Sequence, residues 1–233
     1  MRLVSLAIAA ALGATALPGF ADPVSGTVNG VWVNPNPSGS PIVTSGVGTS
    51  TFTWGTPDGT AANNVNFNKG GGNFSSTTET KFKVGTITYF NGTTASGTTP
   101  DSVDLALTLN FADPALGPVT SDYTFNIVTT TNTSDPDASA DYLNLPTAFS
   151  TTSFLIDGVT YNVKLADFEN IVGDGFLPSD EFSLHVREGG TASADLYAVV
   201  TTQTAAVPEP QNLALMMAGL GMMGLIARRR RAD

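Results

Sequence analysis

The sequence predicts an all-β fold, an antiparallel β-sandwich of jelly-roll type with an apolar helix at each end of the chain. Three observations lead to this prediction. Apolar and polar residues alternate over several stretches, as in strands that bury one face. Turn residues separate about eight to ten such stretches. Charged residues make up only 13% of the chain, and its many Gly, Thr, Ser and Asn residues suit strands and turns better than long helices.

The N-terminal segment, residues 1–21, has the three parts of a secretory signal peptide. Arg2 gives a positive start, residues 3–17 are an apolar run, and Gly19 and Ala21 occupy the −3 and −1 positions of a cleavage site. We therefore expect a signal-peptide helix that signal peptidase removes after Ala21. The protein is accordingly expected to be exported.

The C-terminal segment, residues 208–233, combines a Pro-Glu-Pro motif, the apolar residues 213–227 and four arginines. As a helix the apolar part extends about 22 Å, against roughly 30 Å for the hydrocarbon core of a bilayer. Arginine snorkelling and local thinning of the bilayer close that gap. Because arginines stay on the cytoplasmic side, we expect a transmembrane or sorting helix in the inner membrane, with the body of the chain outside.

This tail resembles a PEP-CTERM sorting signal, and a plain membrane anchor is the alternative. The residues expected to act in sorting and processing, at both ends of the chain, are Ala21, Val207, Pro208, Glu209, Pro210, Arg228, Arg229, Arg230 and Arg231. The resemblance implies that an exosortase of a Gram-negative, exopolysaccharide-producing bacterium is a partner. It also implies transient anchoring, cleavage near the Pro-Glu-Pro motif, and final location at the cell surface or in the extracellular matrix.

Between the two ends the chain is expected to have three parts. Residues 22–50 become rich in Pro, Gly and Ser after Asn34, which indicates an exposed N-terminal strand and connection. Residues 51–202 are expected to form the sandwich domain, and residues 203–207 a linker to the sorting segment.

The clearest strand of the sandwich is residues 103–111, where every second residue is apolar. Residues 123–127, 182–186 and 196–200 repeat this pattern. The alternation changes parity at Gly85, which indicates either a β-bulge or a local twist of the strand. Two further strands flank Asp157-Gly158, a dipeptide typical of a tight hairpin.

The body also resembles the choice-of-anchor K domain of bacterial surface proteins. The matching residues are 52–57, 82–92, Gly97-Thr98, Asp141, 154–158 with Tyr161, and Glu188 ahead of Ser193-Ala194. They cover most of residues 51–202, although residues 64–67 depart from the Ser-x-Leu start usual in that family. The resemblance implies a β domain that precedes different surface anchors and has no established catalytic residues.

Charge and cysteine content exclude several classes of function. Residues 22–207 hold eighteen acidic residues and five cations, a net charge of −13, which repels nucleic acid. The chain has no cysteine, so it has no disulfide, no Cys-ligated zinc, no iron–sulfur cluster and no thiol nucleophile. Its stability is expected to come from the hydrophobic core, with calcium as the one bound ion considered.

Residues 135–141 offer carboxylate and hydroxyl oxygens at alternate positions, as calcium loops do. The candidate ligands are Asp135, Asp137 and Asp141, completed by Asn132 or by backbone carbonyls. The pattern departs from an EF-hand, because the turn glycine and the bidentate glutamate are missing. A solvated acidic loop is the alternative, and no other cofactor is expected.

Catalytic candidates are weak in this sequence. His185 shares a strand face with Ser183, but no Gly-x-Ser-x-Gly elbow accompanies them, so a surface histidine is expected. Asp174, Asp180 and Glu181 would serve a glycosidase only across a sugar-binding cleft. Seven aromatic residues form a candidate sugar platform or, as is usual in sandwiches, core: Trp32, Trp54, Tyr89, Phe90, Tyr123, Tyr142 and Tyr161.

The sequence therefore predicts an exported, non-enzymatic protein of the cell surface or the polysaccharide matrix, with a structural or adhesive β domain. A carbohydrate- or calcium-binding module is the second hypothesis, and an envelope hydrolase the third. The expected partners are signal peptidase, exosortase, the inner membrane in transit and extracellular polysaccharide, and nucleic acid is excluded.

Overall fold

The computed structural model of the 233-residue chain describes residues 22–68, 70, 72–146, 152–156, 159–204, 217–220 and 222. Residues Ala21–Gln203 form one compact unit, called the body below. No helix among the described residues has the length and apolar character that a membrane crossing needs. The predicted signal-peptide helix and all nine residues expected to act in sorting and processing lie outside the described residues, as does most of the predicted C-terminal helix.

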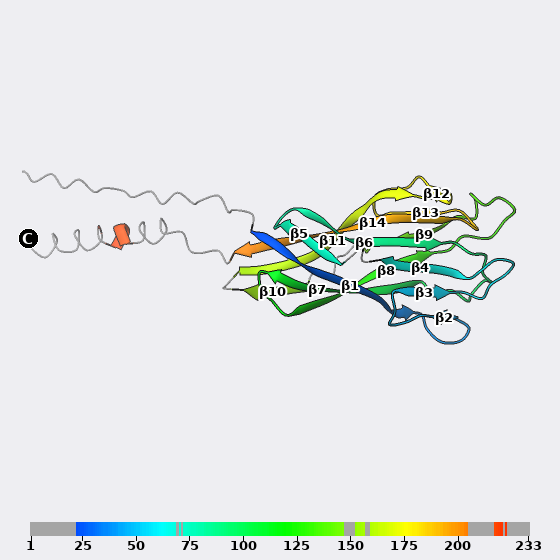
Figure 1. Cartoon of the computed structure of the whole chain (residues 1–233), viewed down its shortest axis with the longest axis horizontal. Coiled ribbons are helices and arrows are strands. Elements are labelled where there is room, and N and C mark those ends of the chain that lie inside the picture. Colours follow the sequence, from blue (N-terminus) through cyan, green and yellow to red (C-terminus); the bar gives the residue numbers. More distant parts are fainter. Residues whose placement is uncertain are drawn as a thin grey trace, which may run out of the picture. The chain divides into compact units, whose positions relative to one another are not determined.

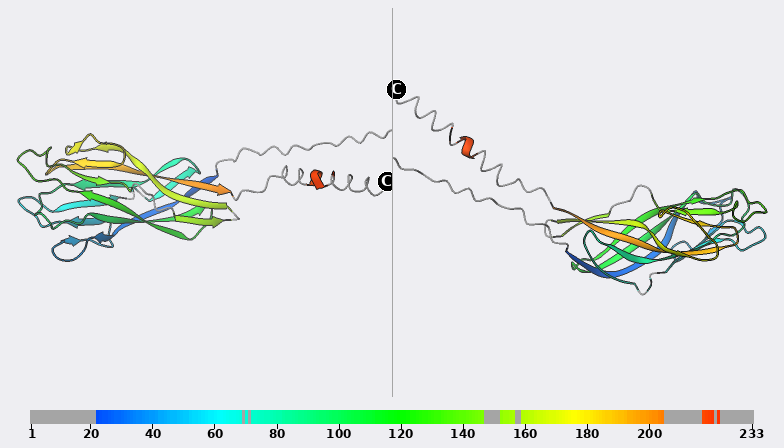
Figure 2. Two further views of the ribbon diagram at one scale, coloured as in Figure 1. Left: turned by 180° about the vertical axis from the view of Figure 1, so that it is seen from behind. Right: turned by 90° about the horizontal axis from the view of Figure 1, so that it is seen from above.

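Strands make up the regular structure of the described body (Figure 1). Their bounds are β1 Pro23–Asn36, β2 Thr44–Ser45, β3 Thr51–Trp54, β4 Asn63–Asn68, β5 Asn73–Thr77, β6 Lys81–Phe90, β7 Ser102–Asp113, β8 Pro118–Val128, β9 Asp141–Asn144, β10 Thr152–Ile156, β11 Val159–Val172, β12 Phe176–Leu177, β13 Ser183–Val186 and β14 Thr191–Thr204. They form two seven-stranded sheets in the orders β12-β13-β9-β8-β7-β1-β5 and β10-β11-β14-β6-β4-β3-β2. The twisted strands run along the length of the body (Figure 2). The predicted all-β class with antiparallel sheets is confirmed.

The two sheets pack against each other through large side chains. Phe74 of β5 stacks on Phe82 of β6, with ring centroids 4.7 Å apart. The hydroxyl of Tyr123, on β8, donates to the carbonyl of Val163, on β11, at 3.3 Å. Each pair joins one sheet to the other, so the apolar side chains form a shared core. Because the chain has no cysteine, burial of this apolar surface is the main stabilising contribution.

The alternation predicted for residues 103–111 is confirmed in β7. Val103, Leu105, Leu107 and Leu109 are fully buried, while the residues between them reach the surface. The predicted stretches in β8 and β14 follow the same pattern. The stretch predicted at 182–186 begins one residue later, because Phe182 is 42% exposed and lies before β13.

The predicted bulge and hairpin are also found. Between β6 and β14 the register shifts where Leu196 faces Gly85 and Tyr197 faces Lys83, which leaves Val84 as the extra residue. Val84 and Gly85 are consequently both buried, and this explains the change of parity in the sequence. In the hairpin, β10 pairs with β11 with Ile156 opposite Val159.

The N-terminal strand differs from the expectation of an exposed strand. β1 lies inside its sheet, paired with β7 on one side and β5 on the other. Val24, Val28 and Trp32 point into the core and are 0–3% exposed. The segment that follows, residues 37–50, is mainly exposed, as expected.

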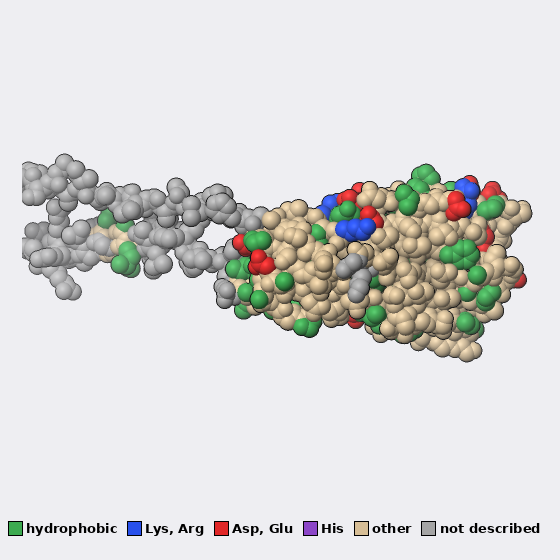
Figure 3. Space-filling view, in the orientation of Figure 1, with side chains coloured by type: hydrophobic (Ala, Val, Ile, Leu, Met, Phe, Trp, Pro, Cys, Tyr) green, Lys and Arg blue, Asp and Glu red, His purple; other side chains and the backbone are tan. Residues whose placement is uncertain are grey.

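Three cations of the body, Lys81, Lys83 and Arg187, lie within ion-pair distance of acidic side chains, and Figure 3 shows basic side chains next to acidic ones on one face. Lys81 on β6 reaches across β14 to Asp167 and Glu169 on β11, at 2.6 and 2.5 Å. Its ammonium also lies 5.8 Å from the ring of Tyr197. Ion pairs this exposed contribute at most about 1 kcal/mol each, so they align strands more than they stabilise the fold.

Candidate functional site

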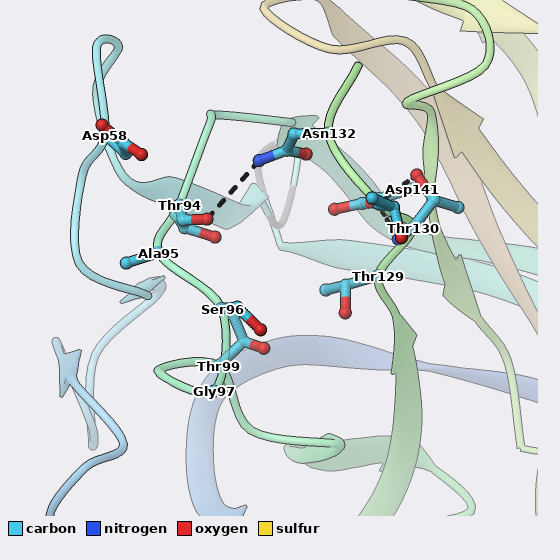
Figure 4. A pocket seen from close by; sticks show the side chains of 11 residues that line it. Asp58, Thr94, Ala95, Ser96, Gly97, Thr99, Thr129, Thr130, Asn132 and Asp141 are labelled. Atoms are coloured by element: carbon cyan, nitrogen blue, oxygen red, sulfur yellow. Dashed lines mark hydrogen bonds between the residues drawn. The ribbon is translucent and has the colours of Figure 1, made fainter.

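Strand connections of the body enclose a polar hollow of about 400 Å³, called the bowl below (Figure 4). The lining residues are Asp58, Thr94, Ala95, Ser96, Gly97, Thr99, Thr129, Thr130, Thr131, Asn132 and Asp141. They come from the connections β3–β4, β6–β7 and β8–β9 and from the first residue of β9. Hydroxyl, amide and carboxylate groups predominate, so the bowl offers many hydrogen-bonding groups and little apolar surface.

Hydrogen bonds between the connections hold the wall of the bowl. The amide N–H of Asp58 donates to the carbonyl of Thr93 at 2.8 Å. The side-chain amide of Asn132 donates to the carbonyl of Thr94 at 3.4 Å, an interaction drawn in Figure 4. The three connections are thus tied to one another, and the bowl has a defined shape.

Asp141 lines the bowl although it is only 4% exposed. Its Oδ1 accepts hydrogen bonds from the backbone N–H of Thr130 at 2.7 Å and from the hydroxyl of Thr130 at 3.3 Å. Burial raises the pKa of Asp141 to about 6, the hydrogen bonds from Thr130 oppose the rise, and the charge of Glu188 adds to it. Asp141 therefore changes its charge at a mildly acidic pH.

The four predicted calcium ligands are engaged separately. Asp135 caps its own turn, with Oδ1 accepting from the backbone N–H of Asp137 at 3.0 Å. Asp137 forms an ion pair with Arg187 at 3.1 Å. Asn132 and Asp141 line the bowl. In the described part of the chain, no three acidic or histidine side chains come together as metal ligands, and calcium binding by the 135–141 loop stays a prediction.

His185 lies on the outer face of β13. Its ring stacks on that of Tyr142, with centroids 3.9 Å apart and planes within 5°. Burial of this ring lowers the pKa of His185, against smaller effects from Pro178 and Asp137. The hydroxyl of Ser183 donates to Asn144 Oδ1 at 2.7 Å, so the two members of the hypothetical nucleophile–base pair have different partners.

The second acidic group lies on exposed turns. Asp174, Asp180 and Glu181 are all exposed. Asp180 Oδ1 accepts from the backbone N–H of Phe182 at 2.9 Å, which caps the turn before β13. Asp180 and Phe182 also line a second hollow of about 400 Å³ with Asn126 and Asn144.

Most of the aromatic candidates are core residues. Trp32, Trp54, Tyr89 and Tyr123 are at most 1% exposed. Trp54 stacks on Tyr89, with ring centroids 5.6 Å apart. Phe90 and Tyr142 are half-buried, and Tyr142 with His185 gives the outer sheet face a flat pair of rings.

No sequence pattern marks the threonines of the bowl as a site. Runs such as Thr129-Thr130-Thr131 are typical of any connection between strands, and their convergence depends on the order of strands in the sheets. Glu188 enters the sequence predictions only through the resemblance to the choice-of-anchor K domain.

Comparison with known proteins bears on the C-terminal segment. No curated protein matches the chain. Residues 206–231 match the model of the PEP-CTERM protein-sorting motif, and they contain the Pro-Glu-Pro motif, the apolar segment and the four arginines noted above. The chain therefore carries a PEP-CTERM sorting motif at residues 206–231, the feature of exported proteins that exosortase processes.

Proposed function

We propose that this chain is a non-enzymatic protein that exosortase sorts to the cell surface or to the extracellular polysaccharide matrix of a Gram-negative bacterium. The β body is its structural or adhesive part. The observation that carries the proposal is the match of residues 206–231 to the PEP-CTERM sorting motif. The net charge of −13 over residues 22–207 supports a well-hydrated protein that stays clear of nucleic acid.

The finer features of the proposal rest on the sequence. Residues 213–227 span the inner membrane during transit, with the arginines on the cytoplasmic side. The body has a jelly-roll arrangement related to the choice-of-anchor K domain. Both features are consistent with a domain that is carried to the surface by its tail and released or attached there.

Sorting can be tested by intact mass and cell fractionation of the full chain, in a host with an exosortase and in the same host lacking it. We expect loss of both ends, near Ala21 and near Pro208, in the competent host, and loss of the N-terminal end alone in the host that lacks exosortase. Glu209→Ala is expected to prevent the C-terminal cleavage there, because it alters the Pro-Glu-Pro motif. Glu181→Ala, an exposed glutamate of the body, is the matched control and should be processed normally.

Retention of the C-terminal segment in both hosts would make it a plain membrane anchor and remove the main support for the matrix location. Normal processing of the Glu209→Ala chain would show that cleavage does not use this motif. Either result can be interpreted without the fold of the body, because each cleavage lowers the intact mass by the mass of the segment removed.

Carbohydrate binding by the bowl is the second candidate function. The bowl is open, about 400 Å³ in volume, and lined mainly by hydroxyl and amide groups, which match the hydroxyls of a sugar. In affinity electrophoresis through the host's exopolysaccharide, Asn132→Ala is expected to reduce retardation several-fold, while the exposed β7 variant Asn110→Ala leaves it unchanged. Equal mobility of the unmodified chain with and without polysaccharide would contradict this function.

A hydrolase is the third reading, and the bowl does contain two acids, Asp58 and Asp141. Glycoside hydrolysis needs two carboxyl groups that both face the bond to be cut, one as the acid and one as the base or nucleophile. Asp141 is 4% exposed and accepts two hydrogen bonds from Thr130, so its carboxyl is built into the wall. This arrangement favours a binding role over catalysis.

A further inference from the structure

Four polar residues lie close together where the two sheets meet beside the bowl, and they are called the oxygen cluster below. They are Tyr89, Asn91, Asp141 and Glu188. Tyr89 and Asn91 come from β6 and the residue after it, on the inward side of that strand. Asp141 begins β9, and Glu188 lies two residues after the end of β13. Tyr89 and Asn91 are 0% exposed, Asp141 is 4% exposed, and both carboxylate oxygens of Glu188 are shielded from solvent.

Backbone contacts bring these residues together from the two sheets. The N–H of Gly189, next to Glu188, donates to the carbonyl of Asn91 at 2.7 Å. The side-chain amide of Asn91 donates to the carbonyl of Val186 at 2.9 Å, and Val186 pairs directly with Asp141. Asn91 is therefore held between the segments that carry the two acids.

Most oxygen atoms of the cluster lack partners, although Oδ1 of Asp141 accepts two hydrogen bonds from Thr130. Within the described residues, the hydroxyl of Tyr89, Oδ1 of Asn91 and both carboxylate oxygens of Glu188 have no hydrogen-bond partner. A 180° flip of the Asn91 side-chain amide would not remove the problem. Its NH₂ group donates to the carbonyls of Val186 and, at 3.4 Å, of Ser139, and the flip would break both hydrogen bonds. Buried polar atoms are normally paired, and a buried carboxylate without a partner is especially unfavourable.

The charges in the cluster also lack compensation. Burial first, and then the charge of Glu188, raises the pKa of Asp141, against the hydrogen bonds from Thr130. Burial first, and then the charges of Asp141 and Glu188, raise the pKa of Tyr89. Arg187 lies next to Glu188 in the sequence, but its ion pair is with Asp137. The cluster thus contains two carboxylates and two neutral oxygens. Among the described side chains, no cation forms an ion pair with either carboxylate.

We propose that the oxygen cluster binds a hard divalent cation, calcium, between the two sheets. All the available atoms are oxygens, and carboxylate with amide oxygens are the ligands that Ca²⁺ prefers. Only two of the four residues are acidic, so the site does not contain the three acidic or histidine side chains that are typical of a metal site, and the described residues hold no such group. The site shares only Asp141 with the ligands predicted from the 135–141 loop. The ion links β6 of one sheet to β9 and β13 of the other. It thus cross-links the two sheets in a chain that has no disulfide to do so.

Calcium titration of the full chain, purified in mild detergent and stripped with EDTA, tests this site. We expect one Ca²⁺ per chain with a Kd of about 0.1–1 mM, the range of extracellular calcium modules. Saturation at about a hundred times Kd should raise Tm by about 5–10 °C. Mg²⁺ at the same concentration should raise it less, because a cage of protein oxygens suits the larger ion.

Glu188→Gln is the decisive variant, since it removes one charge and keeps the shape of the side chain. It should weaken calcium binding at least tenfold. In EDTA, however, its Tm should lie above that of the unmodified chain, because the repulsion between Asp141 and Glu188 is gone. Asp141→Asn should behave in the same way and replaces it if Glu188→Gln fails to fold. Asp137→Asn, which alters only the predicted loop and its Arg187 pair, should bind calcium normally.

Three outcomes would overturn the proposal. One is the absence of any calcium-dependent heat or Tm shift in the unmodified chain at 10 mM Ca²⁺. Another is loss of binding in Asp137→Asn with binding retained in Glu188→Gln, which would place the ion in the 135–141 loop. A third is a lower Tm for Glu188→Gln in EDTA together with no calcium effect, which would show that the two carboxyl groups share a proton instead.

Discussion

Replacing Trp32 by alanine is expected to lower the free energy of unfolding by about 3–5 kcal/mol. The indole of Trp32 is 0% exposed and meets the ring of Phe125 edge to face, with centroids 5.4 Å apart. Within the described residues its N–H has no hydrogen-bond partner, so the loss is one of packing alone. Urea denaturation followed by circular dichroism would measure the change without relying on tryptophan fluorescence.

Val31→Ala is the matched control, because Val31 is the neighbour of Trp32 on the opposite face of β1 and is only half-buried. We expect this variant to cost about 1 kcal/mol or less. If Trp32→Ala costs no more than Val31→Ala, β1 is not a core strand of the body. The comparison also decides whether the folding unit begins near residue 22 or near residue 51.

The sequence predicted β7 correctly and missed the burial of β1 for a physical reason. The inward positions of β1 are residues 24, 26, 28, 30 and 32, and two of them are glycine, so the apolar alternation is interrupted. A Cβ on Gly26 would lie 2.1 Å from the carbonyl oxygen of Asn110, and one on Gly30 would lie 2.7 Å from the ring of Phe67. Glycine is required there because neighbours fill the space, and a single sequence does not show those neighbours.

The bulge at Gly85 and the hairpin between β10 and β11 were predictable because their signals are local. The oxygen cluster was not predictable from the sequence. Asn91, Asp141 and Glu188 are far apart in the chain and meet only through the strand order of the two sheets. The spacing of Asp135, Asp137 and Asp141 indicated one loop. Asp141 instead starts β9 on the same side as the buried Leu143, and its carboxyl bonds to Thr130 in the wall of the bowl.

In calcium-free buffer the stability of the chain is expected to depend on Asp141 between about pH 4 and pH 6. The pKa of Asp141 in the folded protein, about 6, lies above its ordinary value of 3.8. The folded state therefore holds a proton that the unfolded chain releases, and the free energy of unfolding falls as pH rises through this window. A shift of this size corresponds to roughly 3 kcal/mol, lost in full above about pH 6. Urea denaturation at half-unit steps of pH in EDTA would measure it.

Asp141→Asn isolates this contribution from the other acids of the body. The variant keeps an oxygen for the N–H of Thr130 and carries no charge toward Glu188 or Tyr89, so its stability should change less between pH 4 and pH 6. At pH 7 in EDTA it should exceed the unmodified chain, since the cost of a buried charge is removed. Asp174→Asn, an exposed acid on a turn, should keep the full dependence. Parallel curves for the unmodified chain and Asp141→Asn would mean that Asp141 ionises as freely when folded as when unfolded, and that the core tolerates its charge.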